Sequence, residues 1–345
     1  MRKLLQSRWL YVVLVGVTGF VYFNAWRYEQ QMAHTQELVK TDVVEQIIEH
    51  PLHWDAIRSE MARDPLLTLT VLSSGFLFFG MVVAGVFLTV RLLQSGKFSS
   101  LLRVPSKLPS RWTFGDLVRV IILVVVFSLW MPLLKLPVFI ALPSWEQDMN
   151  LWLLVFMVII DLFVIGIIIT FGNFRKPEGW KAFGLPPANA APAVRNGVRA
   201  YLTAFPWIFL ILFSLAELAH RIGYEPPPIP IQNLIFEESR PQMLMLLALL
   251  VCVVGPIAEE LLFRGVIFAT LRQRMGLVVS MLLSGALFAL MHGHWLGFFP
   301  IMLLGCVLSY IYDSTGTLLA PLLVHVLHNS MLLSKGMVMR QLLQL

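Results

Sequence analysis

The sequence contains little charge. Lys, Arg, Asp and Glu together make up 13% of its 345 residues, whereas soluble domains are nearer to one quarter charged. Hydrophobic residues make up 58%, and the mean hydropathy is +0.77. The length would suit two soluble domains, but the apolar runs are too long and too numerous for that. The composition therefore predicts an all-α, polytopic transmembrane helical bundle that lies in a lipid bilayer.

Cysteine is equally scarce. The two cysteines, Cys252 and Cys306, both fall inside apolar runs, so no disulfide framework is expected and neither residue indicates a redox compartment. The formal net charge of +6 does not indicate a nucleic-acid partner, because most basic residues lie in short loops between apolar runs.

The apolar runs predict nine membrane spans. Their ranges are 8–26, 66–92, 117–141, 150–172, 198–219, 241–270, 277–293, 297–312 and 318–336. Two of them, 277–293 and 297–312, are short for the roughly 20 residues that a perpendicular span needs. They could be tilted or partly re-entrant, so eight crossings is the alternative.

Loop charges predict the orientation. Segments 93–119 and 173–199 each carry five basic residues against one acidic residue, and the loops between them are acidic or poor in base. This alternation favours a cytoplasmic N-terminus in a plasma (inner) membrane. The basic start at Arg2 and Lys3 precedes an apolar run without a small-residue cleavage site, which predicts an uncleaved first span.

The first long loop, 27–65, is acidic, with eight Asp or Glu against four Lys or Arg. A weak helical stripe of apolar residues predicts one or two amphipathic helices outside the membrane, interrupted at Pro51. We interpret this loop as a spacer rather than a substrate-docking site. The proline-rich linker 173–197 is the clearest internal boundary.

Adjacent carboxylates, Glu259 and Glu260, interrupt one of the apolar runs. Ionisable groups at membrane depth are costly and usually functional. Glu260 and Arg264 are four residues apart, so they share a helix face in the favourable order. Glu259 points about 100° away. We therefore expect Glu260 to pair with Arg264 and Glu259 to be available for chemistry.

Two later spans add polar residues. His292 ends a helix rich in small residues, one turn after Phe288, while His325 and Asn329 lie four apart on another helix. A carboxylate and an imidazole around one water form a general-base pair, and a second His with an Asn supplies donors for an oxyanion. This pattern indicates amide hydrolysis within the membrane. A zinc site formed by Glu259, His292 and His325 is the alternative.

Other polar residues in apolar segments have simpler interpretations. For Asp161 and Lys135 we favour a helix-to-helix ion pair or a snorkelling lysine over a proton relay. His294 and His328 are interpreted as structural or interfacial neighbours of the candidate site.

These motifs resemble those of a known family. Glu259-Glu260-x-x-x-Arg264, Phe288-x-x-x-His292 and His325-x-x-x-Asn329 occur in this order on successive apolar segments. The pattern is similar to that of the CPBP (Abi) family of intramembrane proteases, which includes the type II CAAX prenyl endopeptidases and bacteriocin-processing proteins. The resemblance covers about residues 240–335.

The resemblance implies an activity and a role for each residue. Glu259 would be the catalytic glutamate that activates water together with His292, and His325 with Asn329 would bind the oxyanion. Glu260, Arg264 and Phe288 would support them. No metal or other cofactor would be required, with zinc as the alternative.

The resemblance also implies a division of the chain. Residues 240–336 would form the catalytic region, 146–239 the helices that lead into it, and 1–145 an N-terminal extension. The predicted protein is a glutamic-type intramembrane endopeptidase acting on a membrane-associated peptide or protein. The alternatives are a non-catalytic immunity or peptide-binding protein of the same family, and a transporter that uses the polar cluster as a relay.

Overall fold

The computed structural model describes residues 1–32, 54–96, 106–109, 112–134, 148–174, 179–186, 189–224 and 230–343. Within these ranges the chain forms helices and turns and contains no β-strand, which confirms the all-α class. Lys135 and residues 33–53 of the acidic loop, with the predicted break at Pro51, lie outside the described residues.

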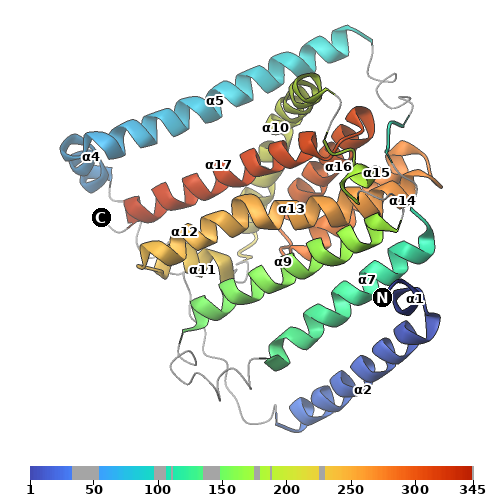
Figure 1. Ribbon diagram of the computed structural model, residues 1–345. Coiled ribbons are helices and arrows are strands. Elements are labelled where there is room, and N and C mark those ends of the chain that lie inside the picture. The colour runs from blue at the N-terminus through green and yellow to red at the C-terminus, as the bar shows by residue number, and fades with distance from the viewer. Residues whose placement is uncertain are drawn as a thin grey trace.

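The helices follow the predicted order along the chain (Figure 1). The longer helices are α2 (Arg8–Met32), α5 (Pro65–Gln94), α7 (Phe114–Trp130), α9 (Met149–Asn173), α10 (Ala190–Arg221), α15 (Leu277–Met291), α16 (Phe298–Thr315) and α17 (Leu319–Leu343). The shorter ones are α1 (Arg2–Leu5), α4 (Trp54–Arg63), η1 (Met131–Leu134), η3 (Gly179–Phe183) and α11 (Pro230–Glu237). The continuous helix 241–272 consists of α12 (Pro241–Leu249), η4 (Leu250–Val254), α13 (Gly255–Glu259), η5 (Glu260–Phe268) and α14 (Ala269–Arg272).

Six helices of the described chain are long and apolar enough to cross a membrane. They are Pro65–Gln94, Phe114–Leu133, Asn150–Asn173, Ala190–Arg221, Pro241–Arg272 and Phe298–Thr315. The other three predicted spans are also helical. However, the apolar part of α2, Arg8–Phe23, and α15 are shorter, and α17 is not among the six candidate spans. The protein is thus a multi-pass helical membrane protein, and the count of eight or nine spans stays a prediction.

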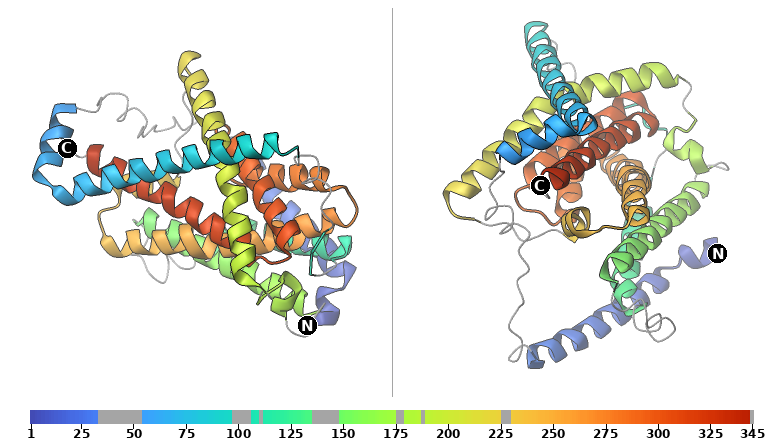
Figure 2. Two further views of the ribbon diagram at one scale, coloured as in Figure 1. Left: turned by 90° about the horizontal axis from the view of Figure 1, so that it is seen from above. Right: turned by 90° about the vertical axis from the view of Figure 1, so that its left-hand side faces the viewer.

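Helix 241–272 lies at the centre of the bundle. It is the most buried of the six candidate spans, because 56% of its most apolar stretch is buried. In Figure 1, α9 lies on one side of it and α17 on the other, while α2 and α5 form opposite edges. The views in Figure 2 show α10 crossing behind α5 and α17. The helix that carries Glu259, Glu260 and Arg264 is therefore packed between other helices of the bundle.

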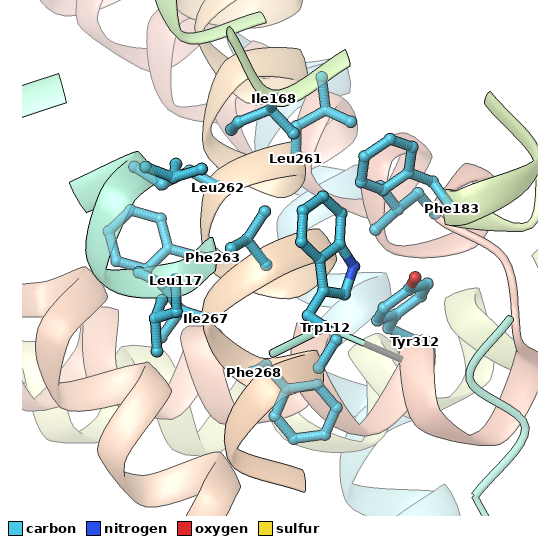
Figure 3. Close-up of a cluster of buried hydrophobic side chains, with 14 of the residues drawn as sticks. Trp112, Leu117, Ile168, Phe183, Leu261, Leu262, Phe263, Ile267, Phe268 and Tyr312 are labelled. Atoms are coloured by element: carbon cyan, nitrogen blue, oxygen red, sulfur yellow. The ribbon is translucent and has the colours of Figure 1, made fainter. Parts of the chain in front are cut away.

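The largest hydrophobic core surrounds the second half of this central helix (Figure 3). Phe263, Ile267 and Phe268 pack there against Trp112 and Phe183 from other segments. Phe183 belongs to η3, within the proline-rich linker, and its carbonyl accepts a hydrogen bond from the Leu318 amide at 3.1 Å. The described part of the linker is thus packed onto the central helix, although the predicted division into regions stays a prediction.

Helix α5 begins at Pro65, one residue before the predicted span 66–92. The Asp64 side chain accepts hydrogen bonds from the Leu66 and Leu67 amides, and Pro65 occupies the first helical position. Helix α4 of the acidic loop packs on α5, so the described end of that loop is helical as predicted.

Close approach of α5 to α10 depends on Gly85. A Cβ at this position would lie 2.2 Å from the Leu202 carbonyl oxygen and 2.5 Å from Cδ of Pro206, which lies within α10. Thr89, one turn later, donates to the Thr203 carbonyl and accepts from Trp207 Nε1. Small residues of this kind let membrane helices pack backbone to backbone.

A polar clamp joins the starts of α9 and α12. Arg240 contacts Asp148 with two guanidinium nitrogens, and its Nη2 lies 2.7 Å from Glu238 Oε2. Hydrogen bonds from Arg240 lower the pKa of Glu238 to about 2 and also lower the pKa of Asp148. The clamp fixes the ends of two helices that both contribute to the candidate site described below.

We expect Gly85→Val to lower the unfolding temperature of the purified protein in detergent. The added methyl groups would overlap α10, and overpacking typically costs about 1–3 kcal/mol. Gly80→Val is the matched control, because a Cβ at Gly80 meets no atom within 4 Å. Equal effects of the two variants would contradict the close contact at Gly85.

We expect the contribution of Arg240 to stability to depend on pH. Because the folded pKa of Glu238 is about 2 and its ordinary value is 4.5, this contribution is complete above pH 4.5 and is lost as the pH falls toward 2. The difference in unfolding temperature between the intact protein and Arg240→Gln should therefore be largest at neutral pH and shrink in acid. A difference that is constant from pH 7 to the acid range would count against the clamp.

Candidate active site

The central helix departs from regular α-helical geometry on both sides of Glu259. Segments η4 and η5 are π-helical and flank the single α-helical stretch α13. In η4 the Gly255 amide bonds to the Leu250 carbonyl, five residues back. The next residue, Pro256, has no amide hydrogen to offer the Val251 carbonyl. A π-helical turn beside a proline therefore leaves one backbone acceptor in need of a partner from another helix.

Asn329 of α17 provides this partner. Its Nδ2 donates to the Val251 carbonyl oxygen at 2.8 Å. The contact joins α17 to the central helix one turn from His325, so it also places the histidine. One hydrogen of the Asn329 amide is used in this way, and the second remains for another acceptor.

Glu260, Arg264 and His325 form a buried ionic cluster. Arg264 Nη1 lies 2.9 Å from Glu260 Oε1, and each of the two side chains is 1% exposed, so the pair predicted from their spacing is present. His325 Nδ1 lies 2.9 Å from the same carboxylate oxygen. Glu260 is thus in contact with both a guanidinium and an imidazole.

Glu259 is in a different position. Its side chain is 25% exposed, and its Oε2 lies 3.5 Å from His325 Nε2. That oxygen is buried and has no hydrogen-bond partner among the described residues. His325 therefore stands between the two carboxylates, with one ring nitrogen toward each. The Glu259 side chain thus keeps contact with the surface while its Oε2 lies inside the bundle, close to the imidazole nitrogen.

The Phe288 ring connects the charged cluster to His292. The Arg264 guanidinium lies 4.3 Å from the Phe288 ring centroid. The rings of His325 and His292 meet Phe288 edge to face, at 5.7 and 4.7 Å between centroids. Nδ1 of His292 donates to the Phe288 carbonyl at 2.8 Å, so in a neutral imidazole Nε2 is the acceptor. His292 is exposed at the end of α15.

The structure brings together most, but not all, of the predicted site residues. Glu259, Glu260, Arg264 and His325 are in direct contact, Phe288 covers Arg264, and Asn329 contacts the helix that carries the carboxylates. Among the described residues, no contact joins His292 to Glu259, and no group of three His, Cys, Asp or Glu side chains is placed to hold a metal ion. The zinc site formed by Glu259, His292 and His325 stays the alternative hypothesis.

Asp161 is the residue whose position the sequence did not indicate. It lies in the middle of α9, and its Oδ2 would be 3.7 Å from a Cβ at Gly255, one turn before Glu259. The two other histidines near the site bond elsewhere: His328 Nδ1 lies 2.8 Å from the Tyr201 hydroxyl, and His294 Nδ1 accepts from the Gly297 amide. A single carboxylate in a long apolar run was the available signal for Asp161. The sequence pattern does not predict which helix packs beside α9, so the position of Asp161 near Gly255 could not be predicted.

These features define a class of protein: a multi-pass helical membrane protein whose central helix carries two carboxylates, one neutralised and one accessible, beside a histidine from another helix. Residues 241–331 match the family model of the type II CAAX prenyl endopeptidase, Rce1-like. This segment, about a quarter of the chain, is therefore an Rce1-like domain of that family, which confirms the resemblance seen in the motifs.

A distant relative supports this assignment. The Bacillus subtilis (strain 168) protein named "Putative membrane peptidase YdiL" is 26% identical over 89 residues, which cover 26% of this chain and 36% of the relative. The match thus spans about a third of that protein. No solved structure matches the chain.

We expect Arg264→Met to be strongly destabilising, because it leaves Glu260 buried with its guanidinium partner removed. Breaking one side of such a pair typically costs about 3–5 kcal/mol. The double variant Arg264→Met with Glu260→Gln should regain part of this loss, as measured by unfolding in detergent.

The exposed pair Arg221–Glu217 has the same four-residue spacing and serves as the control. Arg221→Met should have little effect, since surface pairs contribute little. A double variant less stable than Arg264→Met alone would show that neutralising Glu260 is not the function of Arg264.

Proposed function

We propose that this protein is an intramembrane endopeptidase of the glutamic type, in which Glu259 activates the attacking water. The observation that supports this most directly is the placement of Glu259 Oε2. It is buried, has no hydrogen-bond partner among the described residues and lies 3.5 Å from His325 Nε2, within an Rce1-like domain. A carboxylate in such a position can take a proton from water, which is the first requirement of general-base hydrolysis.

The position of His325 favours a role at the oxyanion. Its Nδ1 contacts Glu260, and its Nε2 lies 3.5 Å from Glu259 Oε2, beside the point where the carbonyl would be attacked. An Nε2–H group at this position would be the donor that an oxyanion requires. The second amide hydrogen of Asn329 would be the other donor.

The proposed reaction proceeds in two steps. Water held by Glu259 and by Nε2 of His292 gives its proton to the Glu259 carboxylate, and its oxygen forms a bond to the scissile carbonyl carbon. The carbonyl oxygen becomes an oxyanion bound by His325 and Asn329. The carbon–nitrogen bond then breaks, and the proton on Glu259 passes to the leaving amine. Phe288 and Arg264 keep His325 and Glu260 in place.

We propose that the reaction takes place within the membrane. Helix α15 has 15 residues, a length of about 22 Å at 1.5 Å per residue, which is less than the roughly 30 Å hydrocarbon core. A turn at His292 would therefore not reach the far interface. We propose eight or nine spans in a plasma membrane with the N-terminus in the cytoplasm, so that a membrane-associated peptide or protein is the substrate. No cofactor is proposed, and zinc is the alternative.

A comparison of peptide termini tests the proposal. Cells that express the intact protein would be compared with cells that express Glu259→Gln, with Glu237→Gln as the matched control because Glu237 is exposed on α11. We expect new termini in membrane and secreted peptides with the intact protein and with the control, and at least a hundredfold fewer with Glu259→Gln.

Identical sets of termini in all three strains would overturn the proposal. If a cellular phenotype then survives Glu259→Gln, the protein is a non-catalytic peptide-binding or immunity member of its family. If the protein is instead a transporter of ions or small molecules, liposomes that contain it would show flux of these solutes without peptide cleavage.

A further inference from the structure

Asp161 has no place in the proposed reaction, yet its position is unusual. It is the one charged residue of α9, which has the highest mean hydropathy of the six candidate spans, 3.0. It lies near the midpoint of that helix and is only half-buried. A carboxylate there is costly for a membrane helix, so it needs an explanation from its surroundings.

Those surroundings are the face of α13 that carries Glu259. Oδ2 of Asp161 would lie 3.7 Å from a Cβ at Gly255, an ordinary van der Waals distance, so the carboxylate lies directly beside this position of the helix. Gly255 and Glu259 are four residues apart and share a face of the helix. Helices α9 and α13 pack against each other, so the two carboxylates lie in the same region of the bundle.

A structural role for Asp161 would need a partner, and the described part of the chain provides none. Among the described residues, no side chain or backbone amide donates a hydrogen bond to its carboxylate, and no cation forms an ion pair with it. The charge of Glu259, one turn from Gly255, has the same sign, so it does not offset the cost of placing Asp161 there. By contrast, Asp148 at the start of the same helix is bound by Arg240. Asp161 therefore presents unused hydrogen-bond acceptors beside the accessible carboxylate.

A substrate would bring donors to this position. A peptide segment must be extended to be cut, so its amides lose their helical hydrogen bonds, and lipid supplies no replacement. We propose that Asp161 is a substrate-binding residue that accepts hydrogen bonds from N–H groups of the substrate next to the scissile bond. The donor is either a backbone amide or a basic side chain. This inference rests on the proposed function, since it assigns the substrate contact of the same site.

Binding to the inactive protein tests the proposal without requiring turnover. The probe is a synthetic peptide that spans the most abundant cut site from the comparison of termini, and the receptor is full-length Glu259→Gln protein in detergent. Adding Asp161→Asn should weaken binding about tenfold, as expected for the loss of a hydrogen bond to a charged group. Adding Asp161→Glu, which keeps the carboxylate, should restore most of the affinity. Adding Asp148→Asn, the control on the same helix, should leave it unchanged.

Two modified peptides identify the donor. If a backbone amide is bound, N-methylation of that amide should weaken binding to the Glu259→Gln receptor and not to the receptor that also carries Asp161→Asn. If a basic side chain is bound, replacing it with norleucine should do the same. Equal affinity of the receptors with and without Asp161→Asn would overturn the proposal even when cleavage by the intact protein has been established.

A stability measurement covers the case in which no cleavage is found. Asp161→Leu should unfold at a higher temperature than the intact protein, because it removes a carboxylate that the fold does not neutralise. Asp148→Asn should unfold at a lower temperature, because it breaks the clamp with Arg240. A lower unfolding temperature for Asp161→Leu would show that Asp161 holds the fold together and would overturn its assignment to substrate.

Discussion

The cost of placing charge at membrane depth governs this structure. Glu260 is 1% exposed, and Arg264 at 2.9 Å and His325 at the same distance offset the cost of burying its carboxylate. This requirement ties α17 to the central helix, because His325 comes from one and Glu260 from the other. Phe288 adds α15 through its contact with the Arg264 guanidinium. Three helices thus meet where a single pair of charges must be neutralised.

Close packing of backbones makes this meeting geometrically feasible. Gly285 and Gly305 bring α15 and α16 together, since a Cβ at Gly305 would lie 2.9 Å from the Gly285 Cα. Gly265 lets the Phe183 ring lie on the central helix, where a Cβ would be 2.8 Å away. The π-helical turn before Pro256 frees the Val251 carbonyl, which Asn329 binds. Small residues and one proline therefore determine where the charged residues meet.

Helical periodicity was sufficient to predict contacts within one helix. It did not predict which residues of different helices contact each other. The spacing of Glu260 and Arg264 gave their pairing, and the apolar runs gave the helices of the described chain. The sequence also singled out Glu259 as the less neutralised carboxylate, which its 25% exposure supports. The π-helical segments, the Asn329–Val251 bond and the position of Asp161 follow from helix packing. No single-helix pattern contains that information.

The two glutamates show how the same constraint separates support from reactivity. Adjacent residues on a helix differ by about 100° in direction, so one can face a cation while the other faces a boundary between helices. Glu260 faces the cation and is buried. Glu259 points elsewhere, with His325 Nε2 3.5 Å from its Oε2 and with Asp161 beside Gly255, one turn earlier on the same helix. A fold that neutralised both carboxylates would be more stable but would have no base to offer. The incomplete neutralisation around Glu259 and Asp161 is therefore the feature of this bundle that stability alone does not explain.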